Sequence, residues 1–389
     1  MKFELTNEQR KYLGLEIVPK SWDKFQITEE VSVYFDGNKI RKKISANENL
    51  YREIQLDEET ENRTMLLPKT KRGKAKKLNY SSLDARNGIG VYFNFDISGI
   101  TIGNYTTEQT FYSTHFENIK FKSINDLPLW IDNFISETTK QDLKDLKQFS
   151  DRKRKRVKLK EGDFFTFKVD RRNYGFGRLI ADIRKIRKEP SFKEQKNYGL
   201  AQLMTQPLVI KVYHIIEDSK KIEFEKLKNL RALPSQYIMD NALFYGDYEV
   251  IGNLPLEDWE IEFPISYARS ISYTDIKTVY LQYGRIYKEA HRDNFYKYIE
   301  IPNPESKNDW DKVLKFNPYR NESIGVGLNF NKSTLERVIA ENSNEPYWND
   351  KTYQREDDLR NPKNKAIKKE IFDYFGLDAE KSYSEDIAE

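Results

Sequence analysis

Hydrophobic and polar residues alternate along much of this chain, and this alternation predicts a protein built mainly of β-strands. In the stretch 163–170, Phe165, Phe167 and Val169 alternate with polar neighbours. A period of two residues is typical of a strand with one buried face. Polar residues follow, and a second strand begins at Tyr174, so residues 160–179 predict a β-hairpin.

The same reasoning predicts further strands and a few short helices. Thr6 and Gln9 form a capping-box pattern, which predicts a helix over residues 7–13. Apolar residues at helical spacing predict two helices within residues 126–147. Hairpins are expected within residues 31–45 and 90–102, strands at 63–67 and 323–330, and helices at 308–314, 333–339 and 361–375.

These elements predict a β-rich α+β protein in four parts. We expect an N-terminal, mostly β domain over residues 1–122, followed by a helical connector and basic linker over 123–156. A central antiparallel, barrel-like β domain should span residues 157–300. A C-terminal helical extension, residues 301–389, should pack on it. A length of 389 residues fits two or three domains.

The composition indicates in which cellular compartment the protein is expected. Cys is absent, which indicates a reducing compartment or indifference to redox state. We find no apolar run suited to a signal peptide or a transmembrane helix, so a cytoplasmic protein without membrane contact is expected. The 66 basic and 62 acidic residues nearly balance, which gives no general argument for nucleic-acid binding.

Recognisable catalytic and metal-binding patterns are missing from the sequence. The three histidines, His115, His214 and His291, are far apart and none is paired at the spacing of metal ligands. There is no Gly-x-Ser-x-Gly and no phosphate-binding glycine loop. Catalytic residues, cofactors and metals are therefore not expected, and His214 is interpreted as a strand-end residue.

A pair of glycines stands out in the second strand of the 160–179 hairpin. Gly175 and Gly177 flank Phe176, and two glycines in a strand indicate a bulge, a sharp bend or close approach of a neighbouring group. We therefore interpret the two glycines as serving the packing of the strand and assign them no catalytic role.

The order of these motifs resembles the immunity protein 26 family of bacterial polymorphic toxin systems. The resemblance starts with a Gly-Asp-x-Phe strand followed by Tyr-Gly-Phe-Gly-Arg, and residues 207–214, 245–252 and 263–267 look like the later strands. Within 157–283, its motif residues are Gly162, Asp163, Tyr174, Gly175 and Gly177. Residues 5–15 and 67–73 resemble a domain that accompanies this family in two-domain versions. A basic insertion at 184–196 departs from the pattern.

The resemblance implies an immunity protein that binds a cognate toxin and neutralises it by protein–protein contact. Acids and tyrosines between residues 237 and 262 could form the contact surface, because tyrosines supply rigid area and acids orient a basic partner. A solvated sheet face is the structural alternative. Residues 257–262 alternate around Trp259 and Ile261 and are expected to form a strand. The candidate residues are Asp240, Tyr245, Asp247, Tyr248, Glu257 and Asp258.

Two other functions stay open. A phosphoester hydrolase is one, since a phosphotriesterase label also occurs within the family, although the metal-ligand pattern is missing. A nucleic-acid-binding module is the other, using the basic runs at residues 69–77, 152–160 and 184–188. These runs contain no aromatic residue for base stacking, so this function is less favoured.

Overall fold

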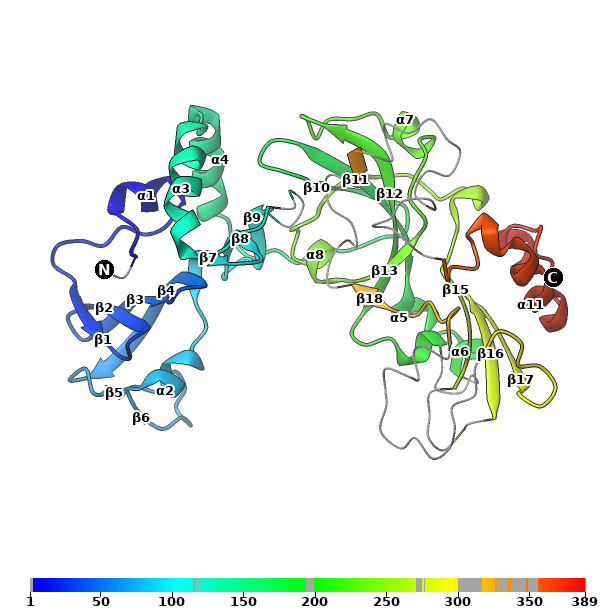
Figure 1. Cartoon of the computed structure of the whole chain (residues 1–389), viewed down its shortest axis with the longest axis horizontal. Helices are drawn as coiled ribbons and strands as arrows, with labels where there is room; N and C mark the ends of the chain where they lie inside the picture. Colours follow the sequence, from blue (N-terminus) through cyan, green and yellow to red (C-terminus); the bar gives the residue numbers. More distant parts are fainter. Residues whose placement is uncertain are drawn as a thin grey trace. The chain divides into compact units, whose positions relative to one another are not determined.

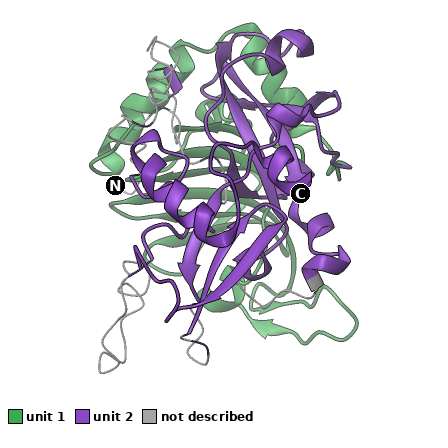
Figure 2. Ribbon diagram, turned by 90° about the vertical axis from the view of Figure 1, so that its right-hand side faces the viewer, with its two compact units in different colours: residues 1–157, 245–247 green, residues 158–244, 248–389 purple. Residues whose placement is uncertain are grey.

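The chain is β-rich α+β, as predicted, and forms two compact units (Figures 1 and 2). One unit comprises residues 1–157 and 245–247, and the other residues 158–244 and 248–389. The computed structural model describes residues 3–114, 117, 119–193, 199–270, 275, 277–299, 317–325, 328, 335–336, 348 and 356–388. The helix predicted at 308–314 and most of the strand predicted at 323–330 and of the helix predicted at 333–339 lie outside the described residues.

The first unit is built on one large antiparallel sheet. Its strands run in the order β1 (Asp23–Gln26), β2 (Val31–Asp36), β3 (Lys39–Ala46), β4 (Leu50–Glu61), β7 (Ile89–Asp96), β8 (Gly99–Asn104) and β9 (Gln109–Ser113). A small ribbon of β5 (Met65–Leu66) and β6 (Lys76–Lys77) extends from β4. The hairpins predicted at 31–45 and 90–102 are therefore confirmed.

Short helices complete the first unit. They are α1 (Asn7–Tyr12), α2 (Tyr80–Asp84), η2 (Ile124–Asp126), α3 (Leu127–Ser136) and α4 (Lys140–Ser150). Thr6 and Gln9 cap α1 reciprocally, which confirms the predicted capping box. The two helices predicted within 126–147 are confirmed as α3 and α4, and Ile131 and Phe149 pack with Phe93 in the core of the unit.

The second unit contains two sheets. The six-stranded sheet has the order β14 (Glu249–Asn253), β10 (Asp163–Lys168), β11 (Tyr174–Asp182), β12 (Pro207–Glu217), β13 (Gln236–Met239) and β18 (Ile324–Gly325). Only the pairing of β13 with β18 is parallel among these described strands. The three-stranded sheet is β15 (Ile265–Arg269), β16 (Thr278–Tyr283) and β17 (Ile286–His291). β10 and β11 are the predicted 160–179 hairpin.

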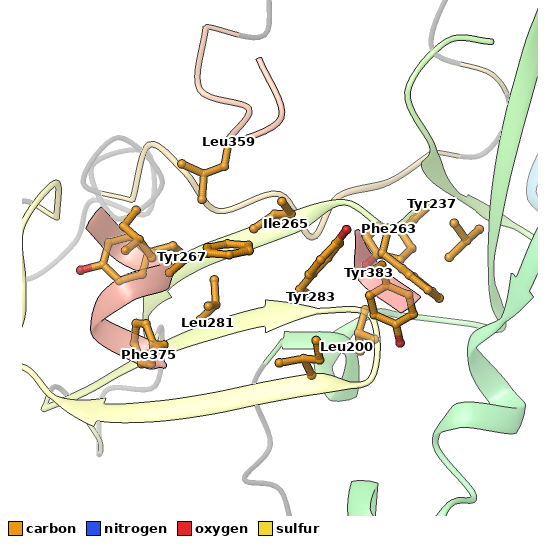
Figure 3. Packing of buried hydrophobic residues seen from close by; sticks show 14 of the residues in the cluster. Leu200, Tyr237, Phe263, Ile265, Tyr267, Leu281, Tyr283, Leu359, Phe375 and Tyr383 are labelled. Carbon is orange, nitrogen blue, oxygen red and sulfur yellow. The ribbon is translucent and has the colours of Figure 1, made fainter. Parts of the chain in front are cut away.

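Helices and 3₁₀ turns connect and cover these sheets. They are α5 (Ile183–Ile186), α6 (Pro190–Lys193), η3 (Gly199–Gln202), α7 (Phe224–Lys228), α8 (Asn241–Phe244), η4 (Asp258–Glu260), η6 (Pro362–Asn364), α11 (Lys365–Phe375) and α12 (Tyr383–Ala388). The helix predicted at 361–375 is confirmed by η6 and α11, and Gly376 ends it with a φ of 72°. Phe375 and Tyr383 from the last helices lie in one apolar cluster with Tyr267 and Tyr283 of the small sheet (Figure 3).

The two glycines of β11 are required by neighbouring rings. A Cβ on Gly175 would lie 2.4 Å from Cζ of Phe167, and one on Gly177 would lie 2.2 Å from Cζ of Phe165. The pairing of β11 with β12 is irregular between these glycines. The predicted bulge and close approach are therefore confirmed, and the glycine motif serves packing.

Candidate protein-binding site

A buried arginine at the end of the glycine motif organises the loop after β14. Arg178 lies on β11 and is completely buried. Its guanidinium donates hydrogen bonds to the carbonyl oxygens of Gly162 at 2.7 Å, Leu254 at 3.2 Å and Pro255 at 3.1 Å. It also lies 3.9 Å above the ring of Phe164. One side chain thus joins the start of β10 to a loop more than 70 residues later.

Gly162 is required where this arrangement is tightest. Its φ is 85°, a conformation that side chains with a Cβ rarely adopt. A Cβ at this position would lie 2.1 Å from the carbonyl oxygen of Leu254. The neighbouring Asp163 accepts hydrogen bonds from the backbone N–H of Lys160 and the side chain of Asn253. The Gly-Asp pair of the motif therefore holds the β10–β14 edge together.

The buried charge of Arg178 is neutralised by Glu260, the last residue of η4. Nε of Arg178 lies 3.0 Å from Oε1 of Glu260, and a terminal nitrogen donates to Oε2 at 3.2 Å. Oε2 also accepts a hydrogen bond from the backbone N–H of Glu257 at 2.9 Å. The 3₁₀ turn η4 is thus fixed by a buried ion pair, which dissolved salt screens only weakly.

An exposed tryptophan and two acids project from this fixed base. Trp259 is 59% exposed, and Glu257 and Asp258 beside it are also exposed. We call residues 257–259 the acidic tryptophan turn. Ser384 of α12 donates a hydrogen bond to the carbonyl oxygen of Asp258 at 3.2 Å, which supports the turn from a second side. The turn offers a rigid aromatic side chain with negative charge around it.

The predicted strand at residues 257–262 is wrong, because this segment forms η4 instead. Glu260 is 3% exposed and bound to Arg178, whereas an alternating strand would have placed it with the exposed acids. Glu262 is also engaged, by Lys211 at 3.2 Å and Arg360 at 2.6 Å. Burial would raise the pKa of Glu262, but these two positive charges outweigh burial and lower it.

The other candidate residues are buried or hydrogen-bonded within their own unit. Asp240 is 7% exposed and its pKa is raised by burial. Tyr248 is 9% exposed and stacks on Phe165, with ring centroids 5.9 Å apart. Tyr245 and Asp247 belong to the first unit, where they accept hydrogen bonds from Gln109 and Thr110 respectively. Of the six residues, only Glu257 and Asp258 lie together on an exposed turn.

Trp259 is the candidate that sequence reasoning did not include. The signal was present, because a tryptophan enclosed by four acids within six residues is unusual for a buried position. The expected strand placed Trp259 and Ile261 on the face opposite Asp258, Glu260 and Glu262. The acidic face was the predicted contact surface. The 3₁₀ turn instead leaves Trp259, Glu257 and Asp258 exposed together.

The three basic runs differ in structure. Residues 69–77 lie on and between β5 and β6, and all of them are exposed. Residues 152–160 are largely exposed, with no helix or strand in that stretch. In the third run, Arg184 pairs with Asp182 at 2.7 Å and Arg187 donates to the carbonyl oxygens of Leu200 and Leu203. The two arginines of the third run therefore contribute to local structure.

Two further observations concern metals and membranes. Within the described residues, histidines and carboxylates form no group of three or more that could hold a metal ion. The same part of the chain contains no helix of sufficient length and apolar character to cross a membrane. His214, on β12, is partly buried, and His115 lies outside the described residues.

His214 makes stability depend on pH. Burial, assisted by the charge of Arg231, lowers the pKa of His214 to about 4 from its ordinary value of 6.5. The unfolded chain therefore takes up a proton at higher pH than the folded chain. We expect the free energy of unfolding to fall as pH decreases from 6.5 towards 4, and His214→Gln to reduce that slope.

Urea unfolding at several pH values between 4 and 6.5 measures the pH dependence of the free energy of unfolding. His291→Gln, at an exposed histidine, is the control, and equal slopes for wild type and His214→Gln would contradict the prediction.

The comparison with protein families bears on the segment that carries this site. Residues 160–275 match the family model of immunity protein 26. The resemblance inferred from the order of the motifs is thereby confirmed for this segment. Arg178, Glu260 and the acidic tryptophan turn all lie within the match. No curated protein and no solved structure matches the chain.

Proposed function

We propose that this chain is an immunity protein that binds a cognate toxin and neutralises it by stoichiometric contact, without performing a reaction. The observation that supports this function most directly is the exposed acidic tryptophan turn, fixed from below by a buried ion pair, within the segment that matches immunity protein 26. The toxin would bind over the turn, and this contact would block the active site or substrate groove of the toxin.

The chemistry of the turn indicates what the partner surface must supply. Tryptophan is enriched among the residues that dominate binding energy, above all where it fills a pocket of the partner. Because η4 is held by Arg178 and Ser384, little conformational entropy is lost when the turn binds. Asp258 and Glu257 add negative charge, part of which is offset by Lys228 at 3.4 Å from Oε1 of Glu257. The complementary toxin surface is therefore an apolar pocket surrounded by basic side chains.

The experiment is a binding measurement between the purified full-length chain and an inactive form of the toxin encoded by the neighbouring gene. We expect Trp259→Ala to weaken binding by about 30-fold or more, corresponding to ~2 kcal/mol, because a central tryptophan anchor is lost. The melting temperature should hardly change, since Trp259 is mostly exposed. Tyr296→Ala is a matched control, because Tyr296 is an exposed aromatic residue of the same unit outside the matched segment.

A charge-reversal arm of the same experiment tests the acids. Glu257→Lys with Asp258→Lys should slow association, and more at low salt than at high salt. Neutralising the basic residues of 69–77 is the comparison. If the basic variant loses protection of toxin-expressing cells while Trp259→Ala and the acidic variant protect fully, the site is wrong although the immunity function stands. Failure of the wild-type chain to bind the toxin would contradict the function itself.

A further inference from the structure

One end of the three-stranded sheet carries a cluster of basic residues on a single face. Arg269 of β15 is paired with Val279 of β16, and Val279 is paired with Ala290 of β17. Side chains directly opposite each other share a face, and so do residues two positions apart on a strand. Lys277 and Arg292 therefore lie on the face of Arg269, and the N–H of Arg292 donates to the carbonyl oxygen of Lys277 at 2.8 Å.

Arg269 is the unusual member of this basic cluster, defined as Arg269, Lys277 and Arg292. It is only 8% exposed, and its Nε is buried without a hydrogen-bond partner. Its backbone N–H donates to Oδ1 of Asn317 at 2.9 Å, so the strand around it is anchored. Among the residues that the structure describes, no carboxylate forms an ion pair with Arg269.

Neither of the two acids nearest in sequence pairs with Arg269, although Asp293 lies beside Arg292 of the cluster. The carboxylate of Asp275 accepts hydrogen bonds from the backbone of Lys277 and from the backbone and hydroxyl of Thr278. The carboxylate of Asp293 lies 3.6 Å from Nε of Arg292 and 3.4 Å from Nδ1 of His291. Burial, together with the charge of Arg292, lowers the pKa of Arg269. The positive charge of Arg269 is thus buried beside another positive charge.

A buried charge without a counterion is costly, and an arriving anion would remove that cost. The guanidinium group presents donors in a planar fork that matches the oxygens of phosphate and carboxylate groups. A phosphate carries up to two charges and suits a cluster of three cations better than a single carboxylate does. Exposed Lys277 and half-buried Arg292 give the cluster access to solvent.

We propose that Arg269, Lys277 and Arg292 form a binding site for a phosphate-bearing ligand at this end of the three-stranded sheet. Arg269 supplies the buried charge at the base of the site, and Arg292 and Lys277 contact the ligand from the solvent side. The site is separate from the acidic tryptophan turn in sequence and chemistry, and the proposal does not rest on the proposed function.

The test is thermal unfolding and calorimetric titration of the full-length chain with inorganic phosphate. Sodium chloride and sodium acetate at matched ionic strength separate phosphate binding from screening and from carboxylate binding. We expect phosphate to raise the melting temperature of the wild type by ~2 °C or more beyond chloride. Arg269→Met should abolish the phosphate-dependent rise, and Arg292→Gln should weaken the titrated affinity at least tenfold.

Lys288→Gln is the matched control. Lys288 is an exposed lysine on β17, four residues before Arg292, and is thus displaced along the strand by about 13 Å. It should keep the full response to phosphate. Should Arg269→Met fail to fold, the titration of Arg292→Gln against Lys288→Gln decides the matter. A response to phosphate no larger than to chloride, an equal response to acetate, or equal losses in Arg292→Gln and Lys288→Gln would overturn the proposal.

Discussion

Replacing Arg178 with methionine is expected to lower the free energy of unfolding of the second unit by about 3–5 kcal/mol, because the substitution leaves Glu260 buried without its partner. The carbonyl oxygens of Gly162, Leu254 and Pro255 lose their donor at the same time. Chemical denaturation of the full-length chain, followed by hydrogen exchange of β10 and β11, measures the effect. The same variant should bind toxin less well, because η4 loses its anchor.

A double-mutant cycle separates the ion pair from the packing of the arginine. Arg178→Met combined with Glu260→Met removes both charges, and it should be more stable than Arg178→Met alone. Arg178→Lys keeps the positive charge but lacks the planar guanidinium group that donates to several acceptors at once. Its free energy of unfolding should therefore lie between those of the wild type and Arg178→Met. If Arg178→Met proved as stable as the wild type, the structural role assigned to Arg178 would be wrong.

The second large effect is expected in the first unit, at Glu53. This carboxylate is completely buried on β4 and contacts two buried cations, Arg10 at 2.9 Å and Lys42. The hydroxyl of Tyr51 also donates to it at 2.8 Å. Glu53→Gln removes the buried negative charge between these two cations, of which Arg10 keeps its pair with Glu4, and we expect a loss of about 3–5 kcal/mol in the free energy of unfolding of this unit.

Glu53 also explains how the N-terminal segment is held. Arg10 lies on α1 and donates to both Glu53 and Glu4, so the network fastens the first helix to the sheet. In Glu53→Gln, hydrogen exchange of α1 should increase before the sheet opens. Glu59→Gln is the matched control, because Glu59 lies on the same strand but is exposed and pairs with Lys39. Equal stability of the two variants would contradict the prediction.

The candidate site shows how far sequence reasoning reached. The acids Glu257 and Asp258 were predicted as contact residues, and the structure leaves both exposed on one turn. Asp240 and Tyr248 belonged to the same predicted surface but are buried. Local pattern cannot make this distinction, because an aspartate on a sheet face and an aspartate beneath a loop have the same sequence signature.

The sequence by itself determined the local elements whose signals are short in range. Alternation along a strand and the Thr6–Gln9 capping box each depend on neighbours within a few residues, and both are confirmed. The order of short motifs that begins with Gly162 likewise indicated the family whose model matches residues 160–275. These features are encoded locally because backbone hydrogen bonds, caps and turns are satisfied by nearby atoms.

Only the tertiary structure decided where the charged residues lie. Residues 257–262 alternate as a strand would, yet Arg178 arrives from 82 residues earlier and holds Glu260 in a 3₁₀ turn. Arg10, Lys42 and Glu53 have the composition of a solvated surface, yet they form a buried network across three elements. A charge can be buried only when its partner is supplied, and that partner comes from a distant part of the chain that no local pattern reveals.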